Sequence, residues 1–250
     1  MFHTFFTEPI YNIVVFFLNL IPNHDVGIAI ILTTILIKLI LLKPNISSQK
    51  SNYLMREAQV EIEEIKNKYK GDNKKIAEET MNLYKKKNIK PFSNFLVLLI
   101  QIPIFFALYY VFRDGVINNP NSLYFFNKFP ENIKHLAFGF LDLSQKYWGV
   151  GVITGITMFI FAKRQANIFK KISNKKENKK DDSFQAVFAK NMQTQMVYFF
   201  PILSGLSAAV LPSVLGVYWT TNNILNILQD IYIKRKLNIE GFIKEHQNKK

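Results

Sequence analysis

Apolar residues of this chain gather in blocks, and stretches rich in lysine and asparagine separate them. The five longest blocks are Val26–Leu42, Phe95–Phe112, Tyr147–Ala162, Met196–Leu211 and Ser213–Leu228. A hydrocarbon core needs roughly 20 apolar residues in a helix, and each block approaches that length. Pro212 separates the last two blocks, which predicts a tight helical hairpin. The pattern therefore predicts an all-α, polytopic membrane protein with five transmembrane helices.

The segment before the first block has a different pattern. Residues 5–20 are apolar, but Glu8-Pro9 lies near their start and Ile21-Pro22-Asn23 follows them. This predicts an amphipathic helix that lies along the membrane surface within residues 1–24. A sixth transmembrane helix is the alternative.

Residues 45–94 carry the periodicity of two helices. Met55, Ala58, Ile62, Ile65 and Tyr69 recur at steps of three and four, which is typical of a helical seam. Gly71-Asp72 then interrupts the pattern, and a second series runs through Ile76, Thr80, Leu83 and the adjoining Tyr84. We expect an antiparallel helical hairpin that projects from the membrane.

The net charge of +14 follows the loops, and its distribution predicts the orientation. Lysine and arginine number 27 in segments 43–94, 163–195 and 229–250, against four in the alternate segments, all within 113–146. Because positive loops stay in the cytoplasm, the N-terminus is predicted outside and the C-terminus inside. The expected segments are 1–24, 25–44, 45–94, 95–112, 113–146, 147–162, 163–195, 196–228 and 229–250.

Lys38 lies inside the first apolar block. A charge at the centre of a membrane helix costs roughly 2.5 to 3.5 kcal/mol, so such residues usually face a polar cavity and serve a function. The alternative is that the long side chain reaches the interface, since Lys43 is only five residues away.

Polar residues line three of the predicted helices. Thr34 precedes Lys38 by one turn, Gln101 lies in the second block, and the fifth block carries Tyr218, Asn222 and Asn226 at steps of four. Each alone fits an interhelical hydrogen bond of about 0.6 kcal/mol. Together they predict a shared hydrophilic cavity lined by Lys38, Thr34, Gln101, Tyr218, Asn222 and Asn226.

Residues for covalent or metal chemistry are missing from the apolar blocks. The sequence has no cysteine, and its histidines, His3, His24, His135 and His246, lie outside the five predicted helices. Neither a nucleophile with a neighbouring base nor a metal-ligand cluster is present. This indicates a protein that is not an enzyme and needs no cofactor or metal.

The chain resembles the YidC/Oxa/Alb family of membrane protein insertases. The resemblance rests on Gly27–Pro44, Leu83–Pro91, Leu98–Tyr110 and Gln195–Gln229, in the order and spacing of the family. The run Leu-Ile-Gln-Ile-Pro-Ile-Phe at Leu99–Phe105 is the most specific part. The resemblance implies five helices around a hydrophilic groove that opens to the cytoplasm and to lipid. The groove cation of the family is usually arginine, whereas this chain has Lys38, which keeps the charge and loses the bidentate fork.

The resemblance also implies a function and its partners. Nascent membrane proteins would be inserted into the bacterial cytoplasmic membrane, with their apolar segments moving along the second and fifth helices into the lipid bilayer. The cytoplasmic hairpin would receive them through Met55, Ile62, Ile65, Tyr69, Leu83 and Tyr84. The basic tail is a candidate contact for the ribosome, with anionic lipid as the alternative, and the general secretion channel is a candidate partner.

Two other functions fit parts of the pattern. A small transporter or channel would use Lys38 as the counter-charge of an anionic solute. A pure assembly chaperone would hold client helices without moving their tails across the membrane.

Overall fold

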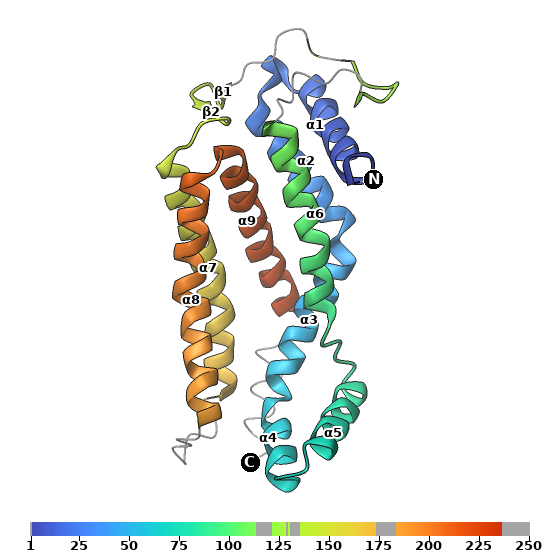
Figure 1. Cartoon of the computed structure of the whole chain (residues 1–250), viewed down its shortest axis with the longest axis vertical. Helices are drawn as coiled ribbons and strands as arrows, with labels where there is room; N and C mark the ends of the chain where they lie inside the picture. Colours follow the sequence, from blue (N-terminus) through green and yellow to red (C-terminus); the bar gives the residue numbers. More distant parts are fainter. Residues whose placement is uncertain (1, 114–121, 129, 131–135, 174–183, 237–250) are drawn as a thin grey trace. The chain divides into compact units, whose positions relative to one another are not determined.

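The computed structural model describes residues 2–113, 122–128, 130, 136–173 and 184–236, and these residues are mostly helical (Figure 1). The helical content confirms the all-α prediction. The chain divides into two compact units. The bundle unit comprises Met1–Ile40, Ile100–Ala166 and Lys180–Leu228, and the hairpin unit comprises Leu41–Leu99, Asn167–Lys179 and Gln229–Lys250.

Several helices of the chain lie wholly or mainly in the bundle unit. They are α1 (Glu8–Leu20), α2 (Val26–Ile40), α6 (Ser93–Arg113), α7 (Trp148–Ser173), α8 (Phe184–Val210) and α9 (Ser213–Lys236). A π-helical turn, His3–Thr7, precedes α1, and a 3-10 turn, Pro22–His24, follows it. The hairpin unit contains α3 (Leu42–Glu57), α4 (Gln59–Lys68) and α5 (Asn73–Lys86), together with the first turns of α6 and the last turns of α7 and α9.

The first apolar block does not form one continuous helix. Helix α2 ends at Ile40 and α3 begins at Leu42. Pro44 explains the break, because it has no N–H and its ring would clash with the carbonyl of Ile40, four residues earlier. Within the described ranges no single helix combines the length and hydropathy of a membrane span, although Val26–Ile40 and Leu42–Met55 reach both together across their break.

Helices α7 and α8 lie side by side (Figure 1) and approach each other closely at glycines. A Cβ atom added to Gly151 would lie 2.5 Å from the carbonyl oxygen of Gly205 and 2.7 Å from the Cβ of Ala209. Gly155 and Gly205 continue the same contact one turn along. The two backbones therefore touch without intervening side chains, as small residues allow in helix pairs.

Helix α9 contacts several other helices of the bundle unit. The hydroxyl of Thr154 in α7 donates to the carbonyl of Gly216 at 3.2 Å and lies 2.9 Å from the hydroxyl of Thr220. The ring of Phe105 in α6 stacks on Trp219, with centroids 5.4 Å apart and planes 5° apart. Ser213 begins the helix, and its N–H and hydroxyl both donate to the carbonyl of Gln145.

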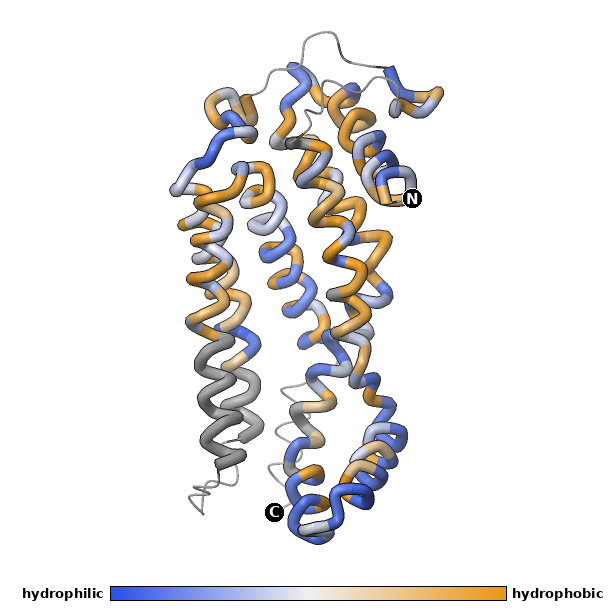
Figure 2. The backbone as a smooth tube through the Cα atoms, in the orientation of Figure 1, coloured by the Kyte–Doolittle hydropathy of each residue, from blue (hydrophilic) through white to orange (hydrophobic). Residues whose placement is uncertain are grey.

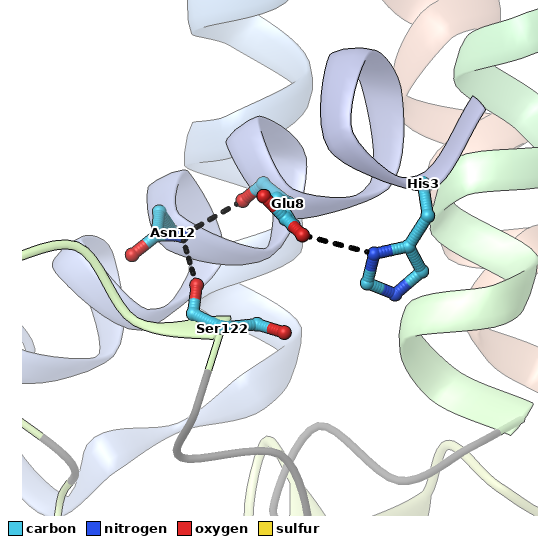
Figure 3. A network of polar contacts seen from close by, with 4 residues as sticks. All are labelled: His3, Glu8, Asn12 and Ser122. Atoms are coloured by element: carbon cyan, nitrogen blue, oxygen red, sulfur yellow. Dashed lines mark hydrogen bonds and ion pairs between the residues drawn. The ribbon is translucent and has the colours of Figure 1, made fainter. Parts of the chain in front are cut away.

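Helix α1 is held to a chain segment more than 100 residues away (Figure 3). The side-chain amide of Asn12 donates to the carbonyls of Glu8 and Ser122, and its oxygen accepts the N–H of Tyr124 at 2.7 Å. His3, just before α1, forms a hydrogen bond with Glu8 at 3.2 Å. These contacts anchor α1 at one of its faces, while Phe16 and Leu20 stay exposed.

The predicted loop 113–146 contains a small sheet that the sequence did not indicate. Strands β1 (Leu136–Ala137) and β2 (Leu141–Asp142) pair antiparallel. The Asp25 carboxylate joins this hairpin to α2, since one oxygen accepts the N–H of Ile28 and the other that of Phe138. Residues 114–121, 129 and 131–135 of this loop lie outside the described residues.

In the hairpin unit, α4 and α5 are largely hydrophilic (Figure 2). Gly71 adopts a φ of 97°, and the Asp72 carboxylate caps α5 by accepting the N–H of Lys75 at 3.0 Å. The turn thus lies where the sequence predicted a break. The predicted seam is interrupted at Ala58, yet helical hydrogen bonds from Ala58 to Leu54 and from Ile62 to Ala58 continue across it.

Polarity in the bundle unit is distributed unlike that of a water-soluble protein. Several polar side chains are buried, namely Thr33, Thr34, Thr154, Ser213 and Asn223. Large apolar side chains are exposed along the outer faces of α7 and α8, including Val152, Ile153, Ile156, Tyr198, Phe199, Ile202 and Leu206. Soluble monomers rarely expose apolar areas of this extent.

The close contact of α7 with α8 predicts the effect of one added methyl group. Gly151→Ala should destabilise the protein by about 1–3 kcal/mol, because the new Cβ overlaps α8. We expect a lower midpoint of thermal unfolding, followed by circular dichroism in detergent. Gly149→Ala is the matched control, since its Cβ would meet nothing within 4 Å. Equal midpoints for both variants would contradict the packing described.

Candidate functional site

Lys38 lies in the last turn of α2 and is half-buried in the bundle unit. Its Nζ donates to Oδ1 of Asn226 at 2.6 Å and to Oδ1 of Asn222 at 3.2 Å. Both asparagines belong to α9 and are four residues apart, so they lie one turn apart on the same helix face. The structure therefore brings together three of the residues that the sequence assigned to the cavity.

The hydrogen-bond partners of the Lys38 ammonium group are neutral side chains. It has three N–H donors, and the two asparagine oxygens accept two of them. Within the described part of the chain, no carboxylate forms an ion pair with Lys38. The positive charge is consequently stabilised by amide dipoles without being neutralised, and it can still attract an anionic group.

The remaining predicted cavity residues are placed differently. Thr34 is 3% exposed, and its hydroxyl donates to the carbonyl of Ile30 in its own helix at 2.7 Å. Tyr218, one turn before Asn222, is 2% exposed. Gln101 is half-buried in α6, and its side chain forms no hydrogen bond with another described residue. These three positions stay predictions as client-contacting residues.

A second polar row on α9 was missed. Asn223 donates to the hydroxyl of Thr157 in α7 at 3.3 Å, and Thr220 meets Thr154 one turn earlier. These contacts hold α9 against α7 while Asn222 and Asn226 meet α2. The spacing of three residues from Thr154 to Thr157 and from Thr220 to Asn223 was the sequence pattern that could have predicted this row.

The residues predicted to receive clients lie in the hairpin unit. Met55 belongs to α3, Ile62 and Ile65 to α4, Tyr69 to the turn, and Leu83 and Tyr84 to α5. All six are half-buried, so each keeps part of its apolar surface accessible. The ammonium groups of Lys68 and Lys75 lie 5.3 and 5.2 Å from the ring centre of Tyr69. The receiving role itself stays a prediction.

The described residues contain no group of three or more histidine, aspartate or glutamate side chains that could hold a metal ion. What the site presents is a positive charge, amide groups and buried hydroxyls. Such a set can lower the cost of polar groups in an apolar environment.

Known proteins identify the family of this chain. The profile of the family described as 60Kd inner membrane protein matches residues 17–240. A protein of Clostridium tetani named membrane protein insertase YidC is 36% identical over 216 residues, which cover 86% of this chain and 84% of that protein. The chain belongs to the YidC family.

Other YidC proteins differ in how much of their length this chain covers. The relative from Fusobacterium nucleatum is 30% identical over 91% of this chain and 98% of its own length. The relative from Francisella philomiragia is 31% identical over 93% of this chain, which spans only 36% of that protein. The predicted YidC/Oxa/Alb resemblance is confirmed, and YidC membership agrees with the prediction of a protein that is not an enzyme.

The contact of Lys38 with α9 predicts how stability responds to its loss. Asn226→Leu should cost about 1–3 kcal/mol, because the partly buried ammonium loses its shorter hydrogen bond, and Asn222→Leu should cost less. Thermal unfolding in detergent measures both. The double variant Lys38→Met/Asn226→Leu should be more stable than Asn226→Leu alone, since it leaves no buried charge without a partner. Additive losses would contradict the contact.

Proposed function

We propose that this chain inserts nascent membrane proteins into the bacterial cytoplasmic membrane. The observation that carries the proposal is the Lys38 ammonium, which Asn222 and Asn226 hold inside an apolar bundle. YidC relatives named as membrane protein insertases support the same function.

The proposed mechanism lowers an energetic barrier and forms no covalent bond. A polar group that enters the hydrocarbon core without a partner costs several kcal/mol. Lys38 and the asparagines of α9 would supply partners for the polar N-terminal tail of a client. An acidic tail gains additional attraction from the positive charge, and the membrane potential favours its outward movement. The client's apolar stretch then moves into lipid along the apolar helix faces.

The proposed arrangement in the membrane has five spans, formed by α2, α6, α7, α8 and α9. The exposed apolar side chains of α7 and α8 support it, because lipid contact requires apolar outer faces. The excess of lysine and arginine in the hairpin, in segment 163–195 and in the tail supports a cytoplasmic C-terminus. Helix α1 would lie along the outer surface.

The proposed partners follow from charge and from half-buried apolar residues of the hairpin. The hairpin α4–α5 would receive clients in the cytoplasm. The basic tail is the proposed contact for the ribosome or for anionic lipid, and the general secretion channel is a further candidate partner. Residues 237–250 lie outside the described part, and Lys234 already pairs with Asp230 at 2.8 Å. Arg235, near the end of α9, is exposed.

Insertion by the purified protein in liposomes tests the function. A single-span client with an acidic N-terminal tail would be scored by protection of that tail from added protease. We expect protection with the native protein, a loss of about tenfold or more with Lys38→Ala, and recovery with Lys38→Arg, because the charge carries the effect. Lys43→Ala is the matched control, since it removes an exposed charge five residues away.

Each other outcome has a defined meaning. Equal insertion by the native protein and Lys38→Ala would show that the charge is unnecessary. A flux of small anions through the native protein, without protection of the client tail, would favour the transporter. Stabilisation of inserted helices without tail movement would favour a pure chaperone.

A further inference from the structure

A fully buried carboxylate lies at the end of α9 in the hairpin unit. The side chain of Asp230 is 0% exposed. One of its oxygens accepts the hydroxyl of Tyr53 from α3, and the other accepts the Nζ of Lys234, one turn further along α9, at 2.8 Å. A buried carboxylate left without donors would be strongly unfavourable, so this arrangement fixes the partners of Asp230.

The partner helix α3 leads into the hairpin that is proposed to receive clients. Tyr53 is 5% exposed and lies near the end of α3. Two residues earlier, the hydroxyl oxygen of Ser51 accepts the N–H of Lys90, just after α5. Helix α3 is therefore bonded both to α9 and to the segment that closes the hairpin.

The hairpin also contains an ion pair that is only partly buried. Lys87, just after α5, pairs with Glu61 in α4 at 2.5 Å, and their side chains are 24% and 45% exposed. Water screens such a pair, and exposed ion pairs contribute little to stability. The contact of α3 with α9 is consequently more deeply buried than the ion pair within the hairpin.

The chemistry of Asp230 suits this role better than a neutral side chain would. A carboxylate has only acceptors, and both Tyr53 and Lys234 present donors to it. An asparagine would turn its own N–H groups toward one of these donors.

We propose that Asp230 is a positioning residue that anchors α3 to the end of α9 and thereby holds the hairpin α4–α5 in one orientation relative to that end, for client capture. The proposal rests on the proposed insertase function for its purpose and on the contacts of Tyr53 and Lys234 for its geometry. Asp230 would thus affect client capture through the position of the hairpin, and it would have no role at the Lys38 site.

The absence of cysteine makes a direct test of the anchor possible. Lys50 in α3 and Arg235 in α9 are exposed and can be replaced by cysteine and spin-labelled in the full chain. We expect a narrow distance distribution between the two labels in the otherwise native protein. Asp230→Asn should broaden it. Tyr53→Phe, which removes one hydroxyl, should broaden it less and guards against misfolding of the first variant. Tyr198→Phe, an exposed tyrosine of α8, is the matched control.

Insertion in liposomes supplies the second readout. Asp230→Asn should raise the client concentration for half-maximal insertion by roughly tenfold, as expected for losing one hydrogen bond to a charged group. The maximal rate should stay within about twofold, because the Lys38 site is intact. General destabilisation would instead lower the maximal rate and leave the half-maximal concentration unchanged.

The outcomes separate the anchor from the function. An unchanged label distance in Asp230→Asn would overturn the anchor. A broadened distance with an unchanged half-maximal client concentration would overturn its role in client capture. Failure of the native protein to insert any client would count against the proposed function, while the distances, measured without client, would still decide the anchor.

Discussion

The Lys38 ammonium must find hydrogen-bond acceptors inside an apolar bundle, and the arrangement of α9 answers this requirement. Two asparagines on one face of α9 supply the acceptors. That face must then be held toward α2, and contacts on a second side of α9 hold it. Thr154 and Thr157 of α7 bind Gly216, Thr220 and Asn223. A helix that satisfies polar partners on two sides is rich in polar residues, as the blue segments of α9 in Figure 2 show. The polar residues of α7 that contact α9 face the inside of the bundle unit, and large apolar residues of α7 and α8 are exposed on the outer faces.

The two units are stabilised by different physical means. In the bundle unit, backbone contact at Gly151 and Gly205 and the stack of Phe105 on Trp219 bring helices together without charge. In the hairpin unit, helices of polar composition are joined by a buried carboxylate and by a partly buried ion pair. Close packing tolerates few alternative arrangements, whereas exposed polar contacts can exchange with water. This difference suits a rigid setting for the Lys38 charge in the bundle unit.

Much of this arrangement was visible in the sequence, and the limits have physical causes. Hydrophobic blocks mark the helices, and the step of four from Asn222 to Asn226 predicted a shared face. Helix α2 ends at Ile40 because of Pro44. The length of the apolar block alone did not predict this break. The bond of Tyr53 to Asp230 joins residues 177 positions apart, and no local pattern announces it. Gln101 was grouped with the cavity by its polarity, but polarity does not specify a partner. The short strands β1 and β2 depend on contacts with α2, which a two-residue pattern cannot reveal.

The stack of Phe105 on Trp219 gives the chain a built-in optical reporter. The protein has only two tryptophans. Trp148 is 78% exposed at the start of α7, whereas Trp219 lies against α6 and one turn before Asn223. Indole emission depends on the polarity around the ring and on its neighbours. We therefore expect the two tryptophans to differ in emission wavelength and in quenching. A client that parts α6 from α9 would unstack Trp219 and change its emission, while Trp148 would keep its own. Opening of the bundle is therefore observable in the unlabelled protein.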